Sequence, residues 1–231
     1  MTGQSGNSTL QAQFHQAFLS HQSGKLPEAK TAYERIIIED PEHFSALHFL
    51  GVIYFQLGTI DKSIELITRA IRVNPDDASA YVNRGISLMR LNKVDEALQD
   101  FQEALRLKPD YAAAHCYLGV SLSELNRKHE ALNYFDAAIG LRPNYADAYY
   151  NKGKALASIK RNDSALACFD EVVRLNPHHF EAYNNRAIVL QEMGRHDDAL
   201  ASIDTAIALK PDYAEAHNNR SNFLRESYGF Y

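Results

Sequence analysis

The chain has 231 residues, of which 45% are hydrophobic and 23% are charged, and its formal net charge is −5. This composition is typical of a soluble globular protein with a continuous core. The acidic balance argues against nucleic acid as the main partner, because binding to phosphates requires a basic face. No run approaches the roughly 18 apolar residues of a membrane span, so we expect no membrane insertion.

The amino terminus and the cysteines favour a cytoplasmic protein. Residues 1–9, MTGQSGNST, have neither the basic start nor the apolar stretch of a secretory signal. They are polar and contain Gly and Ser, and we expect a disordered tail there. Cys116 and Cys168 are predicted to be free thiols in a reducing compartment.

An interval of 34 residues organises the rest of the chain. Six of the seven prolines follow one another at this interval: Pro41, Pro75, Pro109, Pro143, Pro177 and Pro211. A column of small residues has the same period: Gly51, Gly85, Gly119, Gly153 and Ala187. A column of large residues accompanies it: Tyr33, Ile67, Phe101, Phe135, Phe169 and Ile203. Such a period indicates a solenoid of stacked structural repeats.

The first repeat, residues 10–43, differs from the others in two ways. Its first helix carries Gln13, Gln16 and Ser20 where later repeats are apolar. A polar face is expected at the end of an array, because the outermost repeat has no neighbour on that side. Pro27 lies outside the proline series and fits the first turn of a second helix, where its missing N–H is harmless.

The later repeats span residues 44–77, 78–111, 112–145, 146–179 and 180–213. In the repeat 78–111, Gly85 lies in the middle of the first helix, where a missing side chain would let the partner helix approach. Asn92 occupies the turn that ends this helix, and Asp95 is predicted to cap the second helix, which ends at Pro109. Lys160 occupies the turn position of Asn92 in its own repeat, so we expect a strained or different turn there.

Residues 214–226 repeat a first helix without its second helix. We predict a capping helix over these residues and a carboxyl-terminal tail over 227–231. Two interpretations stay open: this helix closes the array, or it marks a boundary within a longer protein.

The period and its columns resemble the tetratricopeptide repeat over about residues 10–226. The resemblance implies an all-α, right-handed solenoid of six helix pairs plus a carboxyl-terminal capping helix. We expect no catalysis, because the sequence has no phosphate-binding glycine motif and no spacing of a nucleophile with a base. No cofactor or metal is expected, and His178 and His179 are interpreted as solvated turn residues.

In the tetratricopeptide family the first helices line a concave groove that binds a peptide. Carried over by position, the groove here is aromatic and aliphatic at its amino end and rich in amides at its carboxyl end. The predicted lining residues are Phe14, Phe18, His48, Phe49, Val52, Phe55, Val82, Asn83, Ile86, Met89, Tyr117, Tyr150, Asn151, Lys154, Asn184, Asn185, Asn218 and Asn219.

One column of this groove contains asparagines at positions 83, 151, 185 and 219. It is similar to the asparagine ladder of the O-linked N-acetylglucosamine transferase arrays, in which the amides bind the backbone of a peptide. The alternative is that repeats arise by duplication and these residues are solvated surface. The neighbouring column, Arg84, Lys152, Arg186 and Arg220, is predicted to form ion pairs with acids on adjacent helices.

The function predicted from this resemblance is a protein–protein interaction scaffold that binds a protein or peptide segment. The alternative is the substrate-recognition segment of a larger glycosyltransferase-like enzyme. A third hypothesis is a homo-oligomer that forms through an apolar patch of Phe14, Phe18, Phe49, Val52 and Phe55.

Overall fold

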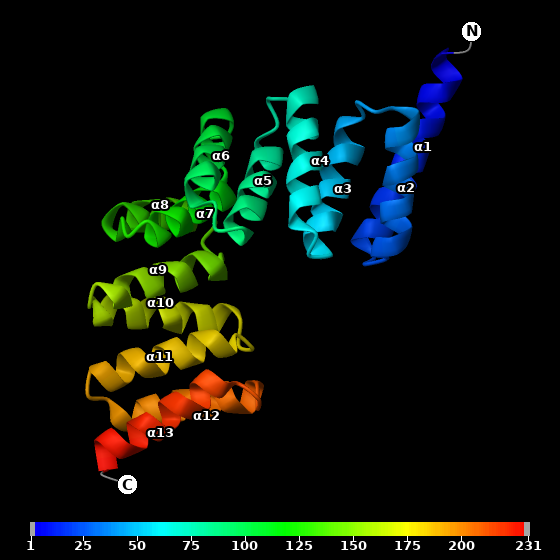
Figure 1. Cartoon of the computed structure of the whole chain (residues 1–231). Helices are drawn as coiled ribbons and strands as arrows, with labels where there is room; N and C mark the ends of the chain where they lie inside the picture. Colours follow the sequence, from blue (N-terminus) through cyan, green and yellow to red (C-terminus); the bar gives the residue numbers. More distant parts are fainter. Residues whose placement is uncertain (1–2, 229–231) are drawn as a thin grey trace. The chain divides into compact units, whose positions relative to one another are not determined.

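The computed structural model describes residues 3–228, which form thirteen α-helices and no strand (Figure 1). The predicted all-α solenoid of helix pairs is therefore confirmed. The helices divide into two compact units, residues 1–110 and residues 111–231. None of the described helices is both long enough and apolar enough to cross a membrane.

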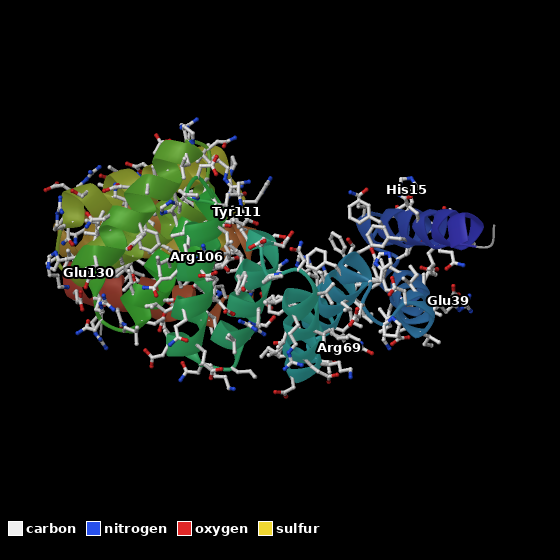
Figure 2. The ribbon with its side chains drawn as sticks, turned by 90° about the horizontal axis from the view of Figure 1, so that it is seen from above. His15, Glu39, Arg69, Arg106, Tyr111 and Glu130 are labelled. Carbon is white, nitrogen blue, oxygen red and sulfur yellow. The ribbon has the colours of Figure 1, made fainter. Side chains whose placement is uncertain are left out.

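The first unit contains three helix pairs. Its helices are α1 (Gly3–Gln22), α2 (Leu26–Glu39), α3 (Phe44–Gln56), α4 (Ile60–Val73), α5 (Ala78–Arg90) and α6 (Val94–Leu107). Each helix packs against the helix that follows it, so that every pair stacks on the next pair. Arg69, labelled in Figure 2, joins α4 to the turn after α2 by donating to the carbonyl of Pro41 at 3.3 Å.

The second unit contains three further pairs and a last single helix. Its helices are α7 (Ala112–Glu124), α8 (Lys128–Leu141), α9 (Ala146–Ser158), α10 (Asn162–Leu175), α11 (Phe180–Glu192), α12 (His196–Leu209) and α13 (Ala214–Tyr228). The helix α13 packs on α12 and α11, as a capping helix does.

The two ends of the chain differ from the sequence prediction. Residues 3–9 belong to α1, so the expectation of a disordered tail is wrong for them. The helix α13 continues to Tyr228, two residues beyond the predicted end of the cap. The rest of the predicted tails, residues 1–2 and 229–231, lies outside the described residues.

Contacts between the small and large columns build the core. Phe101, Phe135 and Phe169, from the column of large residues, have no exposed surface. A Cβ atom placed on Gly85 would lie 2.6 Å from Cε1 of Phe101, and one on Gly119 would lie 2.7 Å from Cε1 of Phe135. Real side chains do not approach so closely, so each glycine makes room for the aromatic ring of its partner helix.

The turns inside the pairs share one backbone conformation. The residue that follows each first helix and its cap has a positive φ, between 58° and 77°: Gly24, Gly58, Asn92, Asn126, Lys160 and Gly194. Lys160, with φ 61°, therefore adopts the same turn as its equivalents, and it has the largest steric penalty among them. Asp95 does not cap α6 as predicted; the cap residue is Lys93, and Asp95 lies in the first turn near the positive end of the helix dipole.

Candidate functional site

The predicted groove residues all lie on the first helix of each pair. We call the surface that these helices form within each unit the first-helix face of that unit: α1, α3 and α5 in the first unit, and α7, α9, α11 and α13 in the second. Within each unit, neighbouring first helices also touch each other, as α3 touches α5 and α7 touches α9. A side chain at this contact is covered by the next repeat.

Three predicted lining residues lie at such contacts and are buried. His48 is 4% exposed, Val82 is 3% exposed and Asn184 has no exposed surface. The prediction that they line a groove is wrong, because their column faces the next first helix and not the solvent. In the column that follows by one residue, Phe49, Asn83, Tyr117, Asn151, Asn185 and Asn219 are half-buried and reach the surface.

The aromatic residues of the first unit pack on one another. The ring of Phe18 lies edge-on to Phe49 at 5.1 Å between centroids, and Phe14 lies 6.1 Å from Phe49 and 6.2 Å from Phe18. All three are half-buried, as are Val52 and Phe55. The apolar patch therefore covers much of itself and leaves a smaller surface for a second copy of the chain than the sequence suggested.

Three of the four ladder asparagines are bonded to the preceding first helix. Each amide donates to the residue 35 positions earlier, on the preceding first helix. Asn83 donates to Nε2 of His48 at 2.8 Å, Asn185 to the hydroxyl of Tyr150 at 3.0 Å, and Asn219 to Oδ1 of Asn184 at 2.9 Å. These amides tie successive repeats together, so the column is structural at these three places.

His15 occupies the equivalent position on α1, which is the first of the described helices. Its side chain is exposed on α1 (Figure 2).

Asn151 is the exception in the ladder. The residue 35 positions earlier is Cys116, a buried thiol that is hydrogen-bonded to Tyr145 and whose pKa burial raises to about 12. The amide of Asn151 donates instead to the carbonyl of Asp147 on its own helix, at 2.8 Å. Its oxygen and its second N–H are therefore not engaged in a bond between repeats.

Asn151 lines a pocket of about 280 Å³ between α7 and α9, which we call the α7–α9 pocket. Its floor is apolar, and polar groups surround it. The lining residues are Val120, Ser123, Glu124, Lys128, Phe135, Asn151, Lys154, Ala155 and Ser158. The hydroxyl of Ser123 is buried and has no hydrogen-bond partner among the described residues.

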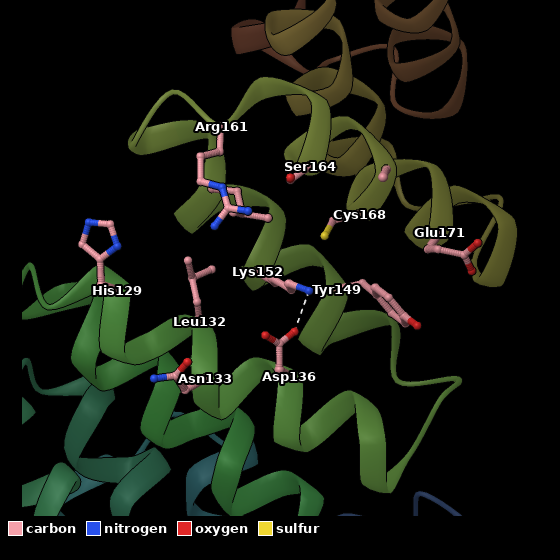
Figure 3. A pocket seen from close by; sticks show the side chains of 12 residues that line it. His129, Leu132, Asn133, Asp136, Tyr149, Lys152, Arg161, Ser164, Cys168 and Glu171 are labelled. Carbon is pink, nitrogen blue, oxygen red and sulfur yellow. Dashed lines mark ion pairs between the residues drawn. The ribbon is translucent and has the colours of Figure 1, made fainter.

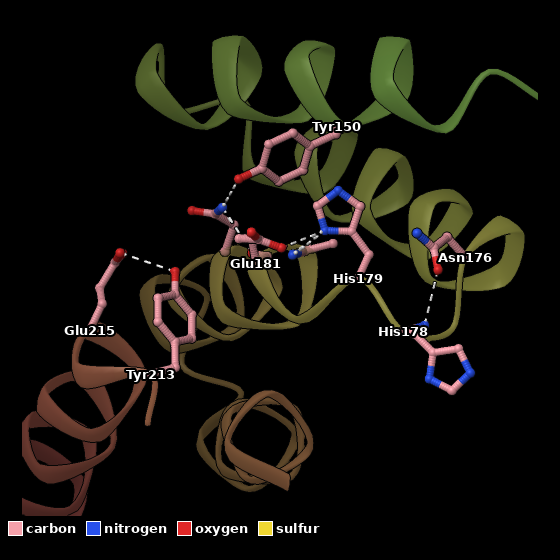
Figure 4. A network of polar contacts seen from close by, with 9 residues as sticks. Tyr150, Asn176, His178, His179, Glu181, Tyr213 and Glu215 are labelled. Carbon is pink, nitrogen blue, oxygen red and sulfur yellow. Dashed lines mark hydrogen bonds and ion pairs between the residues drawn. The ribbon is translucent and has the colours of Figure 1, made fainter. Parts of the chain in front are cut away.

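The last repeats contain a network of polar contacts between side chains of the first helices and of the turns before them (Figure 4). Asn184 donates to Glu215 at 2.9 Å, and the hydroxyl of Tyr213 donates to the same carboxylate at 3.1 Å. The ring of His179 lies 4.7 Å from that of Tyr150. Burial raises the pKa of the Tyr150 hydroxyl, which stays protonated at neutral pH.

His179 is not the solvated turn residue that the sequence suggested. Its Nδ1 accepts a hydrogen bond from the backbone N–H of Ala182 at 3.3 Å and so caps α11, and it lies 3.2 Å from Glu181. His178 is exposed, as expected. The signal for the cap was available, because Asp77 caps α5 from the equivalent position, 102 residues earlier.

The basic column next to the asparagines forms the predicted ion pairs with second helices. Lys152 lies 2.6 Å from Asp136, and Arg84 lies 2.6 Å from Asp100. Arg186 and Arg220 pair in the same way with Asp170 and Asp204. In the part of the chain that the structure describes, no three metal-ligating side chains come together.

The fold and this face define an all-α repeat protein built from helix pairs. Sequence models of the tetratricopeptide repeat match residues 78–111 and, in a second form, residues 22–78, 118–180, 160–214 and 184–227. These matches cover well over half of the chain, which belongs to the tetratricopeptide repeat family. No curated protein matches the sequence.

Solved structures show the same fold. YrrB, described as a tetratricopeptide repeat protein with an unusual peptide-binding site, is 24% identical with a TM-score of 0.62, over 82% of this chain and 98% of its own. PilW, a type IV pilus biogenesis factor, is 19% identical with a TM-score of 0.83, over 91% and 98%. The pilF protein of Pseudomonas aeruginosa is 17% identical with a TM-score of 0.81, over 94% and 98%.

Proposed function

We propose that the chain is a non-catalytic scaffold and that it binds an extended segment of another protein at the α7–α9 pocket. The observation that carries this proposal is the state of Asn151. It is the one ladder asparagine whose amide is not tied to the preceding repeat, and it lies in a pocket together with Lys154. The tetratricopeptide family membership favours a protein or peptide partner, and the YrrB likeness supports a site of this kind.

The pocket can accommodate the main chain of a peptide together with one small apolar side chain. The amide of Asn151 can accept from a peptide N–H and donate to a peptide carbonyl. Lys154 is exposed and can reach a second acceptor. Val120 is half-buried and offers apolar surface against which a ligand side chain can be buried.

A selection experiment tests this proposal and does not require the natural partner. Peptides selected from a random display library against the intact chain are titrated against the double variant Asn151→Ala, Lys154→Ala. We expect a loss of about 2–4 kcal/mol, which is about 30-fold or more in Kd, because one neutral and one charged hydrogen bond are removed. Gln102→Ala, which removes an exposed amide from the second helix α6, is the control and should change nothing. Equal affinities for all three proteins would refute the proposal.

A further inference from the structure

The second unit has a larger cavity, which is formed by the second helices α8 and α10 and the first helix α9. It has a volume of about 560 Å³ and lies between α8, α9 and α10 (Figure 3). Ligand sites commonly have volumes of about 300–1,000 Å³. The residues that matter here are His129 and Leu132 from α8, Lys152 and Leu156 from α9, and Arg161 and Ser164 at the start of α10.

Arg161 differs from its equivalents in the other repeats. In three of those repeats, the basic residue before the second helix forms an ion pair with an acid three residues later. Lys93 lies 3.4 Å from Glu96, Arg127 lies 2.7 Å from Glu130, and Arg195 lies 2.6 Å from Asp198. The residue three positions after Arg161 is Ser164, which is not an acid. Arg161 has no ion pair among the described residues.

A second acid of the repeat pattern is also missing beside this cavity. His129 occupies the position at which other repeats carry Asp61, Asp95, Asp163 and Asp197. Figure 3 shows the guanidinium of Arg161 inside the cavity, with His129 to one side and Ser164 to the other. Both replacements remove negative charge from the surroundings of one guanidinium group.

The other charged residues of the cavity are already paired. Lys152 lies 2.6 Å from Asp136, and Glu171 lies 2.8 Å from Arg174. One permanent positive charge, on Arg161, is therefore left without a partner among the described residues. Leu132 and Leu156 are almost completely buried and form an apolar wall next to it.

We propose that this cavity binds a carboxylate group that is attached to a short hydrocarbon skeleton. A guanidinium group presents paired donors that match the two oxygens of a carboxylate, and the hydroxyl of Ser164 can donate to the same group. The leucine wall contacts the skeleton. The carboxylate takes the place of the acid that Glu130 and Asp198 supply within their own repeats. Its source is either a small carboxylic acid or an acidic side chain of a protein.

Nuclear magnetic resonance of the full chain tests this proposal with defined probes. The side-chain Nε–H of Arg161 and the backbone N–H of Ser164 are followed at constant ionic strength and pH. The probes are isovalerate for a free acid, N-acetylglutamate amide for an acidic side chain, isovaleramide as the neutral control, and inorganic phosphate. We expect saturable shifts with at least one of the first two probes and none with isovaleramide. The carboxylate probe that binds with the higher affinity identifies the source.

Two variants and two controls locate the binding. Arg161→Gln removes the guanidinium, and Ser164→Glu restores the acid of the other repeats at a helix start, where glutamate is favourable and folding is preserved. Each variant should lower the affinity for the carboxylate by about tenfold or more. Arg161→Gln removes a charge-assisted hydrogen bond, and in Ser164→Glu the guanidinium is already paired with the new glutamate. The controls Arg127→Gln and Arg195→Gln should leave the affinity for the carboxylate unchanged.

Three results would overturn the proposal. They are the absence of saturation with both carboxylates, undiminished binding to the Ser164→Glu variant, and equal binding of phosphate. This cavity shares no lining residue with the α7–α9 pocket. A negative result for carboxylate binding would therefore leave the proposed function standing.

Discussion

The side-chain amide of Asn185 donates a hydrogen bond of 3.0 Å to the hydroxyl of Tyr150, one helix pair earlier. The bonds of Asn83 to His48 and of Asn219 to Asn184 have the same spacing. A column that resembles a ligand-binding ladder is thus mainly a set of ties between repeats. The one untied member, Asn151, marks the candidate binding pocket.

The ties predict unequal costs of removing two similar asparagines. Asn185 and Asn151 both donate to a carbonyl four residues earlier, but only Asn185 also bonds the preceding repeat. We expect Asn185→Ala to lower the free energy of unfolding by about 0.5–1.5 kcal/mol. Asn151→Ala should be neutral or slightly stabilising, because alanine is the better helix former. Urea denaturation measures both, and equal losses would contradict the distinction.

His48 should make stability depend on pH. Burial lowers the pKa of His48 below its ordinary value of 6.5, while the charge of Asp77 opposes this shift. Because an amide nitrogen can only donate, Nε2 of His48 accepts from Asn83 and must be unprotonated. The unfolded chain therefore binds this proton more readily. The stabilisation is complete above pH 6.5 and is lost as the pH falls below it, by up to about 1.4 kcal/mol per pH unit.

The variant His48→Gln isolates this contribution, since glutamine can accept the same hydrogen bond but does not titrate. The difference in free energy of unfolding between the two proteins should shrink or reverse as the pH falls from 7 to 5. A difference that is constant over this range would show that His48 is not the group responsible.

The glycine and phenylalanine columns predict a coupled pair of substitutions. Gly119→Ala places a methyl group against the ring of Phe135 and should destabilise by about 1–3 kcal/mol. Phe135→Ala alone should cost about 3–5 kcal/mol. The double variant should cost less than the sum, because the new methyl group enters the space left by the ring. The control is Gly140→Ala in α8, which meets nothing within 4 Å and should stabilise by roughly 1 kcal/mol.

The turn at Lys160 predicts a gain from glycine. With φ 61° the lysine backbone is strained, and the ion pair with Glu192 that would be lost is exposed and contributes little. We expect Lys160→Gly to raise the free energy of unfolding by about 0.5 kcal/mol. This is the gain that remains when the extra entropy that glycine gives the unfolded chain is subtracted from the relief of strain. Asn126→Gly should gain less, because asparagine tolerates this conformation. The reverse order in thermal denaturation would contradict this account of the turn.

Much of the fold was predictable from the sequence because each helix pair repeats the same packing problem. The 34-residue columns indicated the helix pairs, the Gly85–Phe101 type of contact and the ion pairs of Arg84 and its equivalents. The candidate site was predicted less well. His48 and Asn184 lie one position from the surface column, and only the contact between successive first helices shows that they are buried.

The hydrogen-bond acceptors of the asparagines also could not be predicted from the 34-residue columns. Bonds between residues 35 positions apart connect two different columns, so a comparison at the period of 34 does not show them. The acceptors are His48, Tyr150 and Asn184, three chemically different residues. Asn151 differs only because Cys116 lies at that place, and this difference defines the site.

The most direct test of the central claim is the map of backbone amide chemical shifts when a peptide selected for binding is titrated into the ¹⁵N-labelled chain. We predict that the largest shifts occur around the α7–α9 pocket, at Val120, Ser123, Asn151 and Lys154. The tied asparagines at positions 83, 185 and 219 should keep their side-chain amide resonances, because their hydrogen bonds stay in place. Shifts that cluster on the second helices, with Asn151 and Lys154 unchanged, would contradict binding at this pocket.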